Sequence, residues 1–160
     1  MTIQFSADQL KEVVRLHGLS LDDTSTGERA NLSRANLSGA ILSDAILSDA
    51  IGLPITEDAP SRLLAVAHAA LANDDALEMR TWHTCETTHC ICGWAEHLGG
   101  PLARLLIKTN GNDVGGLMLL GVEAHEHFYQ SNEEARAFLQ SVIDNARVAE
   151  TAPEPQQEAA

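Results

Sequence analysis

The stretch "RANLSRANLSGAILSDAILSDAIGLP", residues 29–54, repeats itself every five residues. Its alanines are Ala30, Ala35, Ala40, Ala45 and Ala50, and its leucines are Leu32, Leu37, Leu42 and Leu47. An α-helix turns through about 500° in five residues, so successive Ala/Leu pairs would wander around it. On a flat strand an odd period moves the pair to the opposite face each time. The pairs therefore stay inward only if the chain turns a corner every five residues.

Four such corners close a square coil, with alanine and leucine inside and the other positions outside. This pattern resembles the pentapeptide-repeat family, whose motif is A(D/N)Lxx and whose fold is a right-handed quadrilateral β-helix. Residues 30–32 and 35–37 match the motif fully, whereas Ile41 and Ile46 occupy its Asn/Asp position. Pro54 ends the run, which amounts to little more than one coil.

The resemblance extends from roughly Phe5 to Val142. A segment with "LHGL" precedes the repeats, and "GLP", "WHTCETTHC", "GWA" and "FYQSNEEA" follow them in that order. This order is similar to a group of small pentapeptide-repeat proteins of phages and proteobacterial prophages. The resemblance implies matching cysteines at Cys85 and Cys90, whereas Cys92 departs from the group's pattern and is expected to be incidental.

Helical signals flank the repeat. Ser6 is a plausible N-cap, an apolar stripe that includes Leu10 and Val13 follows, and Gly18 is a stop signal. Further helices are predicted from about 61 to 71, from about 90 to 108 with a break at "GGP", and from Ser131, which forms a capping box with Glu134.

A single coil cannot bury its own core, so helices are expected to cover both of its ends. We therefore predict an α+β fold, in which a short right-handed quadrilateral β-helix of about one coil is capped by an N-terminal helix and a C-terminal helical domain. The predicted units are 1–24 (helix and loop), 25–54 (coil), 55–149 (helical Cys/His-containing domain) and 150–160 (disordered tail).

The bulk composition excludes several classes of protein. No apolar run reaches the roughly 18 residues that span a bilayer, and the first ten residues lack the features of a secretory signal, so the expected location is the cytoplasm, with no membrane partner. The odd number of cysteines, three, argues against a secreted disulfide framework. A net charge of −13 disfavours direct binding to nucleic acid and suits a protein partner.

The stretch "WHTCETTHCICGW", residues 82–94, holds all three cysteines and both tryptophans. Zinc prefers tetrahedral sets of cysteine and histidine, and the candidate ligands are His83, Cys85, His89 and Cys90. No CxxC motif elsewhere in the chain supplies a further pair of ligands. Trp82 and Trp94 are expected to anchor the core, with a binding role as the alternative.

Three other interpretations of the stretch stay open. A Cys85–Cys90 disulfide would close a short loop. A cysteine nucleophile could pair with a nearby histidine, and a helix N-terminus would lower the pKa of the Cys90 thiol. The cysteines could instead be small apolar core groups. Downstream, "EAHEHFY" is expected to be an exposed turn, with a pH-sensitive patch as the alternative, although Tyr129 within it is predicted to lie in the core.

These observations favour a non-enzymatic acidic interaction protein of phage or prophage type that binds a host or phage protein. The alternatives are a thiol- or zinc-dependent enzyme centred on the Cys/His motif and a structural zinc-binding module. Some longer pentapeptide-repeat proteins imitate duplex DNA and act on DNA gyrase, but one coil is too short to present such a surface.

Overall fold

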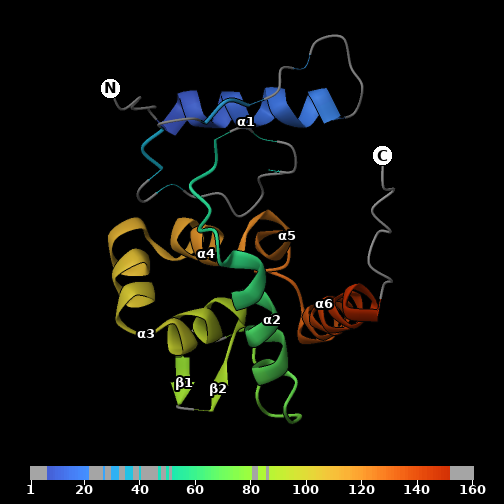
Figure 1. Ribbon diagram of the computed structural model, residues 1–160. Helices are drawn as coiled ribbons and strands as arrows, with labels where there is room; N and C mark the ends of the chain where they lie inside the picture. Colours follow the sequence, from blue (N-terminus) through green and yellow to red (C-terminus); the bar gives the residue numbers. More distant parts are fainter. Residues whose placement is uncertain are drawn as a thin grey trace, which may run out of the picture.

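A computed structural model of the chain describes residues 7–21, 27, 30–32, 35–37, 40, 47, 50, 52–80, 83–85 and 87–151, with only the backbone at 7–8, 18, 20–21 and 83–85. Its elements are α1 (Ala7–Leu21), α2 (Ala59–Ala70), β1 (His83–Cys85), β2 (Thr88–His89), α3 (Ile91–Asn110), α4 (Asn112–Leu120), α5 (Val122–His125) and α6 (Asn132–Thr151) (Figure 1).

The predicted α+β fold with a quadrilateral β-helix is wrong. The described residues lie mostly in helices, and their only named strands form the short antiparallel hairpin of β1 and β2. In the repeat, the backbone hydrogen bonds that join described residues to one another are turns: the N–H groups of Ala35, Ala40 and Ala50 each donate to the leucine carbonyl three residues earlier. A β-helix needs stacked coils that pair with one another, and the four to five repeats seen in the sequence make little more than one coil.

The repeat nevertheless orients its side chains as the period predicts. Ala30, Leu32, Leu37 and Leu47 are buried, whereas Asn31 and Asn36, between the inward positions, are exposed. The buried side chains pack with Leu10 and Val13 of α1 and with Val114 and Leu117 of α4. We call this cluster the repeat core. It lies between α1 and α4, as Figure 1 shows for the described part of the segment.

Helix α1 is longer than its sequence signals predict, because it continues through Gly18 to Leu21. Its His17 is fully buried, and the Nδ1 atom accepts a hydrogen bond from the backbone N–H of Ala30 at 3.2 Å. This bond fixes the end of α1 to the first repeat.

The remaining helices enclose a second cluster, the helical core, in which α2 lies against α3 and α6. Trp94 is buried there, as predicted, and its Nε1–H donates to the carbonyl of Ala76 at 2.8 Å. Helix α6 begins with the predicted capping box: the N–H of Glu134 donates to Ser131 Oγ at 3.3 Å, and the N–H of Ser131 donates to Glu134 Oε2 at 2.9 Å.

Helix α3 breaks at the predicted "GGP". Gly100 has φ 64° and ψ −147°, a conformation that glycine adopts without a Cβ clash, and Pro101 follows it. The break divides α3 into a first half that starts at the hairpin and a second half that packs against α4.

Helix α4 connects the two cores. Val114 and Leu117 belong to the repeat core, whereas Leu119 and Leu120 belong to the helical core. A helix that is apolar all round is buried on more than one side, and α4 has that composition because each side meets a different cluster.

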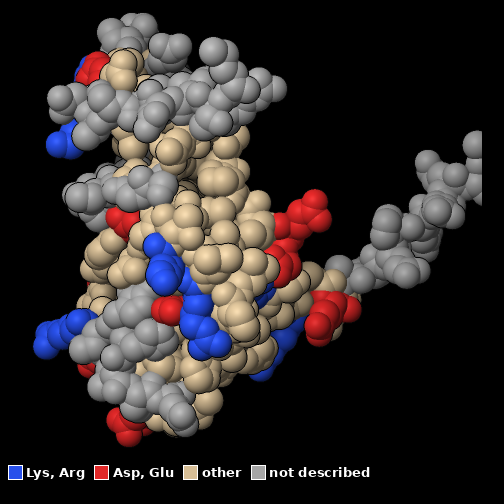
Figure 2. Space-filling view, turned by 90° about the vertical axis from the view of Figure 1, so that its left-hand side faces the viewer, with Lys and Arg blue, Asp and Glu red and all other residues tan. Residues whose placement is uncertain are grey.

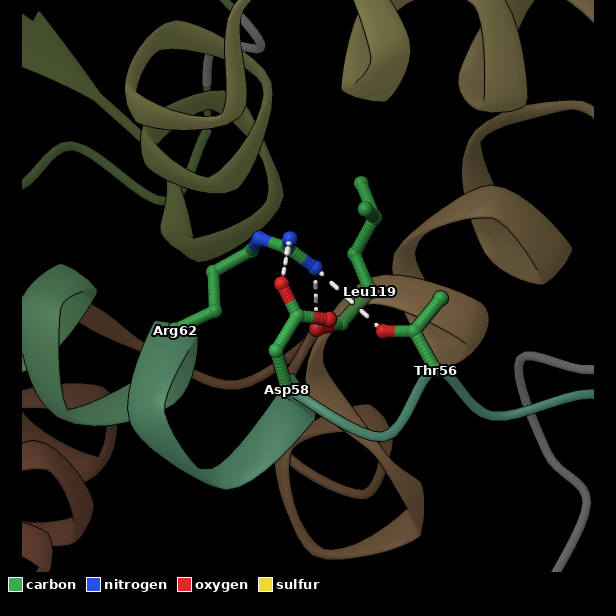
Figure 3. Close-up of polar contacts among 4 residues, drawn as sticks. All are labelled: Thr56, Asp58, Arg62 and Leu119. Carbon is green, nitrogen blue, oxygen red and sulfur yellow. Dashed lines mark hydrogen bonds and ion pairs between the residues drawn. The ribbon is translucent and has the colours of Figure 1, made fainter.

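Arg62 of α2 reinforces the junction between the repeat and the helices (Figure 3). Its guanidinium donates to Thr56 Oγ1 and to the carbonyl of Leu119, both at 3.3 Å, and it pairs with Asp58. Close by, the N–H of Thr56 donates to the carbonyl of Met118 at 2.8 Å. The segment that leaves the repeat is therefore bound to the end of α4.

None of the helices that the structure describes combines the length and apolar character required to cross a membrane.

Candidate functional site

The Cys/His stretch forms a corner between the hairpin and α3. In the hairpin, His83 pairs with His89 and Cys85 pairs with Thr88. The backbone of His89 also exchanges hydrogen bonds with residues 76–78: its N–H donates to Ala76, and its carbonyl accepts from Glu78, both at 3.1 Å. Because the strand is held on both sides, the start of α3 is fixed in place.

Cys90 is the N-cap of α3. Its backbone is extended (φ −72°, ψ 175°), and its Sγ atom accepts a hydrogen bond from the N–H of Gly93 at 3.3 Å. A side-chain acceptor at this position satisfies one of the N–H groups left over at the start of a helix. Neither Cys90 nor Cys92 takes part in a disulfide in the structure, so the Cys85–Cys90 disulfide weighed from the sequence is not present there.

The four predicted zinc ligands lie on this corner. The side chains of His83 and Cys85 lie outside the described residues, as does Trp82. The ring of His89 is buried, and its centroid lies 4.7 Å from that of Trp94 and 4.9 Å from that of His97. Among the described side chains, no three of His, Cys, Asp and Glu are arranged to hold a metal. The four-ligand zinc site stays a prediction.

Cys92, which is expected from the sequence to be incidental, lies beside Cys90 in the wall of a cavity of about 300 Å³. The cavity lies where the starts of α3 and α4 meet the turn after α5. Its lining residues are Met79, Arg80, Cys90, Cys92, Asn112, Asp113, Phe128 and Tyr129. Among these residues, only Cys90 is a candidate ligand from the sequence.

Two adjacent glycines of α4 allow this helix to approach α3 and Phe128 closely. A Cβ at Gly115 would lie 2.7 Å from the Cα of Ile107 in α3, and a Cβ at Gly116 would collide with Cys92 Sγ and with the ring of Phe128. The pair "GG" inside a helical segment is the sequence signal for this approach, because glycine in a helix interior costs stability unless packing requires it.

Burial controls the chemistry of both thiols. It raises the pKa of Cys90 despite backbone hydrogen bonds that act in the other direction, and it raises the pKa of Cys92 still more, with Cys90 and Asp113 adding to the effect. The predicted lowering of the Cys90 pKa is therefore wrong, because desolvation of a thiolate outweighs the helix N-terminus here. Both groups are protonated thiols at neutral pH.

Asp113, Tyr129 and His125 form a polar cluster beside the thiols. The Tyr129 hydroxyl donates to Asp113 Oδ1, and the Nε2 atom of the buried His125 lies 3.9 Å from the same oxygen. Although much of the ring is exposed, desolvation at the hydroxyl end, with the hydrogen bond to Asp113 in second place, raises the pKa of Tyr129 well above its ordinary value. Burial lowers the pKa of His125, and Asp113 only partly opposes this.

No sequence pattern predicts this cluster. The stretch "EAHEHFY" is expected to be an exposed turn, whereas His125 within it is buried. Tyr129 is predicted to lie in the core, but it is 62% exposed while its hydroxyl reaches Asp113. The one available signal is an aspartate in the first turn of a helix followed by two glycines.

Comparison with protein families connects one part of the chain to known sequences. Residues 28–51 match the model of the pentapeptide repeats family (8 copies). The match agrees with the resemblance drawn from the Ala/Leu period. No curated protein and no solved structure matches the chain.

The pentapeptide match covers the repeat and ends well before the Cys/His corner. The cavity lined by Cys90 and Cys92, which we call the thiol cavity, is nevertheless connected to the pentapeptide repeats through α4. Its first turn supplies Asn112 and Asp113 to the cavity wall, while Val114 and Leu117 pack against the repeat leucines.

Proposed function

We propose that this chain is a non-enzymatic interaction protein of phage or prophage type that binds a host or phage protein. The observation that carries the proposal is a set of large apolar side chains left exposed on the described surface: Ile55, Leu98, Leu102, Leu105, Tyr129 and Val148. Three of them lie in α3. Exposed apolar residues that gather on one element are typical of a surface that meets another protein. Pentapeptide repeats, which the chain carries, are often found in protein-interaction modules.

The thiol chemistry supports the same conclusion. The thiolate is the nucleophilic form of cysteine, and burial keeps both Cys90 and Cys92 protonated. The polar groups beside them are a protonated tyrosine and a histidine whose pKa burial lowers. Such a cluster stabilises a packed corner better than it activates a nucleophile.

The proposal is tested by capture from lysates of a candidate host and of phage-infected cells, with the purified chain as bait. We expect one protein to be recovered, and then to bind the chain when both are purified and titrated. The Cys90→Ser/Cys92→Ser variant should retain the binding. Failure of every captured protein to bind in purified form would contradict the proposal, as would turnover of a substrate that depends on either thiol.

The structural zinc module remains a second candidate because of the hairpin register. The backbone of His83 pairs with that of His89, and Cys90 follows directly, so the chain brings these three candidate positions together at the hairpin. The test is elemental analysis of untagged protein. About one zinc per chain, lost in Cys85→Ala or Cys90→Ala, would support the module, whereas metal-free protein with full stability would exclude it.

A further inference from the structure

The second half of α3 has an unusual outer face. Ala103 and Ile107 point into the helical core, while Leu102 and Leu105, on the outer side, are 63% and 59% exposed. A surface helix normally has polar side chains outside, and α6 follows that rule apart from Val148: its other exposed positions include Glu133, Gln140, Asp144, Arg147 and Glu150. We call Leu102, Arg104, Leu105 and Lys108 the α3 outer face.

The charge of this face is opposite to that of the chain. The chain has a net charge of −13, yet residues 97–112 contain no acidic residue. Arg104 and Lys108, four positions apart, are exposed, and within the described part of the chain neither has an ion-pair partner. Figure 2 looks onto the side of the molecule where α3 lies in Figure 1, and it shows basic side chains near the middle of that side, with a smaller acidic group beside them and no broad acidic area among the described residues drawn.

Two exposed leucines three positions apart, with a row of two cations along one side of them, define what fits this face. An amphipathic helix can pack its own apolar stripe along the leucines. Acidic side chains at the edge of that stripe would meet Arg104 and Lys108. A second copy of the chain fits less well, because symmetric pairing of this face would bring the same cations together with no carboxylate of this segment to neutralise them.

We propose that the α3 outer face binds an acidic amphipathic helix of a partner protein. The proposal rests on the proposed function and deepens it, since it identifies the surface and the chemistry of the partner. The leucines supply the apolar contact, and the two cations set the orientation and the preference for an acidic helix.

The test uses a fluorescent synthetic helix with leucines at i, i+3 and i+7 and glutamates along both edges of that stripe. Two control peptides carry lysine instead of glutamate, or the same residues with the leucines scrambled. We expect the full-length chain to bind the glutamate peptide and to bind both controls at least about tenfold more weakly. Binding should weaken as salt is raised.

Chain variants locate the binding. Leu102→Asp/Leu105→Asp and Arg104→Glu/Lys108→Glu should each lose at least about tenfold in affinity for the glutamate peptide. The matched controls are Val148→Asp and Arg147→Glu, which change an exposed valine and an exposed arginine of α6. They should bind as the unchanged chain does, and thermal melting would verify that every variant is folded.

Several results would overturn the proposal. These are the absence of binding by the glutamate peptide, binding of the lysine peptide with equal affinity, and an equal loss of affinity in the α6 control variants Val148→Asp and Arg147→Glu. Sedimentation provides another: a dimer that becomes a monomer in Leu102→Asp/Leu105→Asp would show that a second copy covers the face. A protein partner that binds the unchanged chain and this variant equally well would leave the proposed function standing and refute the α3 proposal alone.

Discussion

The repeat core and the helical core are built in different ways. The repeat core takes buried side chains at five-residue intervals from one short segment, and it needs Val114 and Leu117 of α4 to complete it. The helical core joins α2, α3 and α6, which are far apart in the sequence, around Trp94 and a set of aliphatic side chains.

The difference indicates which core depends on the other. A repeat unit that cannot bury its apolar side by itself needs neighbours or caps, and here α1 and α4 are the caps. Helix α4 also supplies Leu119 and Leu120 to the helical core, so it stays anchored whether or not the repeat is folded. We expect the helical core to be stable without the repeat core, and the repeat core to be lost when the helical core unfolds.

The strongest test of this dependence compares Leu139→Ala with Leu47→Ala. Both leucines are completely buried, Leu139 in the helical core and Leu47 in the repeat core. Each truncation should cost about 2–5 kcal/mol through lost burial and the cavity that remains. Hydrogen exchange should show Leu139→Ala weakening protection in both cores, and Leu47→Ala weakening it only in the repeat and α1. Equal loss everywhere in both variants would show that the two cores form one cooperative unit.

A second test acts on the shared helix. Gly115→Ala places a methyl group against the backbone of Ile107, which cannot move as a side chain could, so we expect a loss of about 1–3 kcal/mol. Because α4 would be displaced, both cores should be weakened, as measured by denaturant unfolding together with hydrogen exchange. Ala137→Gly, at an exposed position of α6, gives the helix-propensity contribution of about 1 kcal/mol without a packing change. A Gly115→Ala protein more stable than the unchanged chain would contradict the close approach.

The sequence predicts the local features of both cores well. The five-residue period places Leu32, Leu37 and Leu47 inward, and the capping box at Ser131 and the break at Gly100 lie where their motifs predict. Each of these depends on residues within a few positions of one another. The β-helix prediction is wrong because a period specifies where side chains point, whereas hydrogen-bond ladders require a second coil.

The thiol cavity was predictable only in part, because its members meet through tertiary packing. Asp113 and Tyr129 come together when the start of α4 meets the turn after α5, which no local pattern encodes. The pKa of Cys90 shows the same limit. The local rule for a helix N-terminus predicts a lowered value, but burial by neighbouring elements reverses its direction.

A third test cuts the link between the cores at Arg62. The substitution Arg62→Met keeps the length of the side chain and removes its hydrogen bonds to Thr56 and to the Leu119 carbonyl. We expect a loss of about 1 kcal/mol, seen by hydrogen exchange as weaker protection of the repeat with the helical core unchanged. Arg136→Met is the matched control, because Arg136 of α6 donates to the Asp74 carbonyl, in the segment after α2, and is not among the described residues that form the repeat core. Equal effects of the two substitutions on the repeat would show that Arg62 does not couple the cores.

The smallest expected effect is a pH dependence that arises beside the helical core, at His125. Burial lowers its pKa in the folded chain, so the unfolded chain, with an ordinary value of about 6.5, binds a proton more readily. The contribution of this residue to stability is therefore full above about pH 6.5 and falls as the pH drops from there toward the lower folded pKa. His125→Gln should flatten the fall in unfolding free energy between about pH 7 and pH 5, while His68→Gln, on the exposed side of α2, should not. If the slope in His125→Gln matched that of the unchanged chain, the acid sensitivity would have to come from other groups.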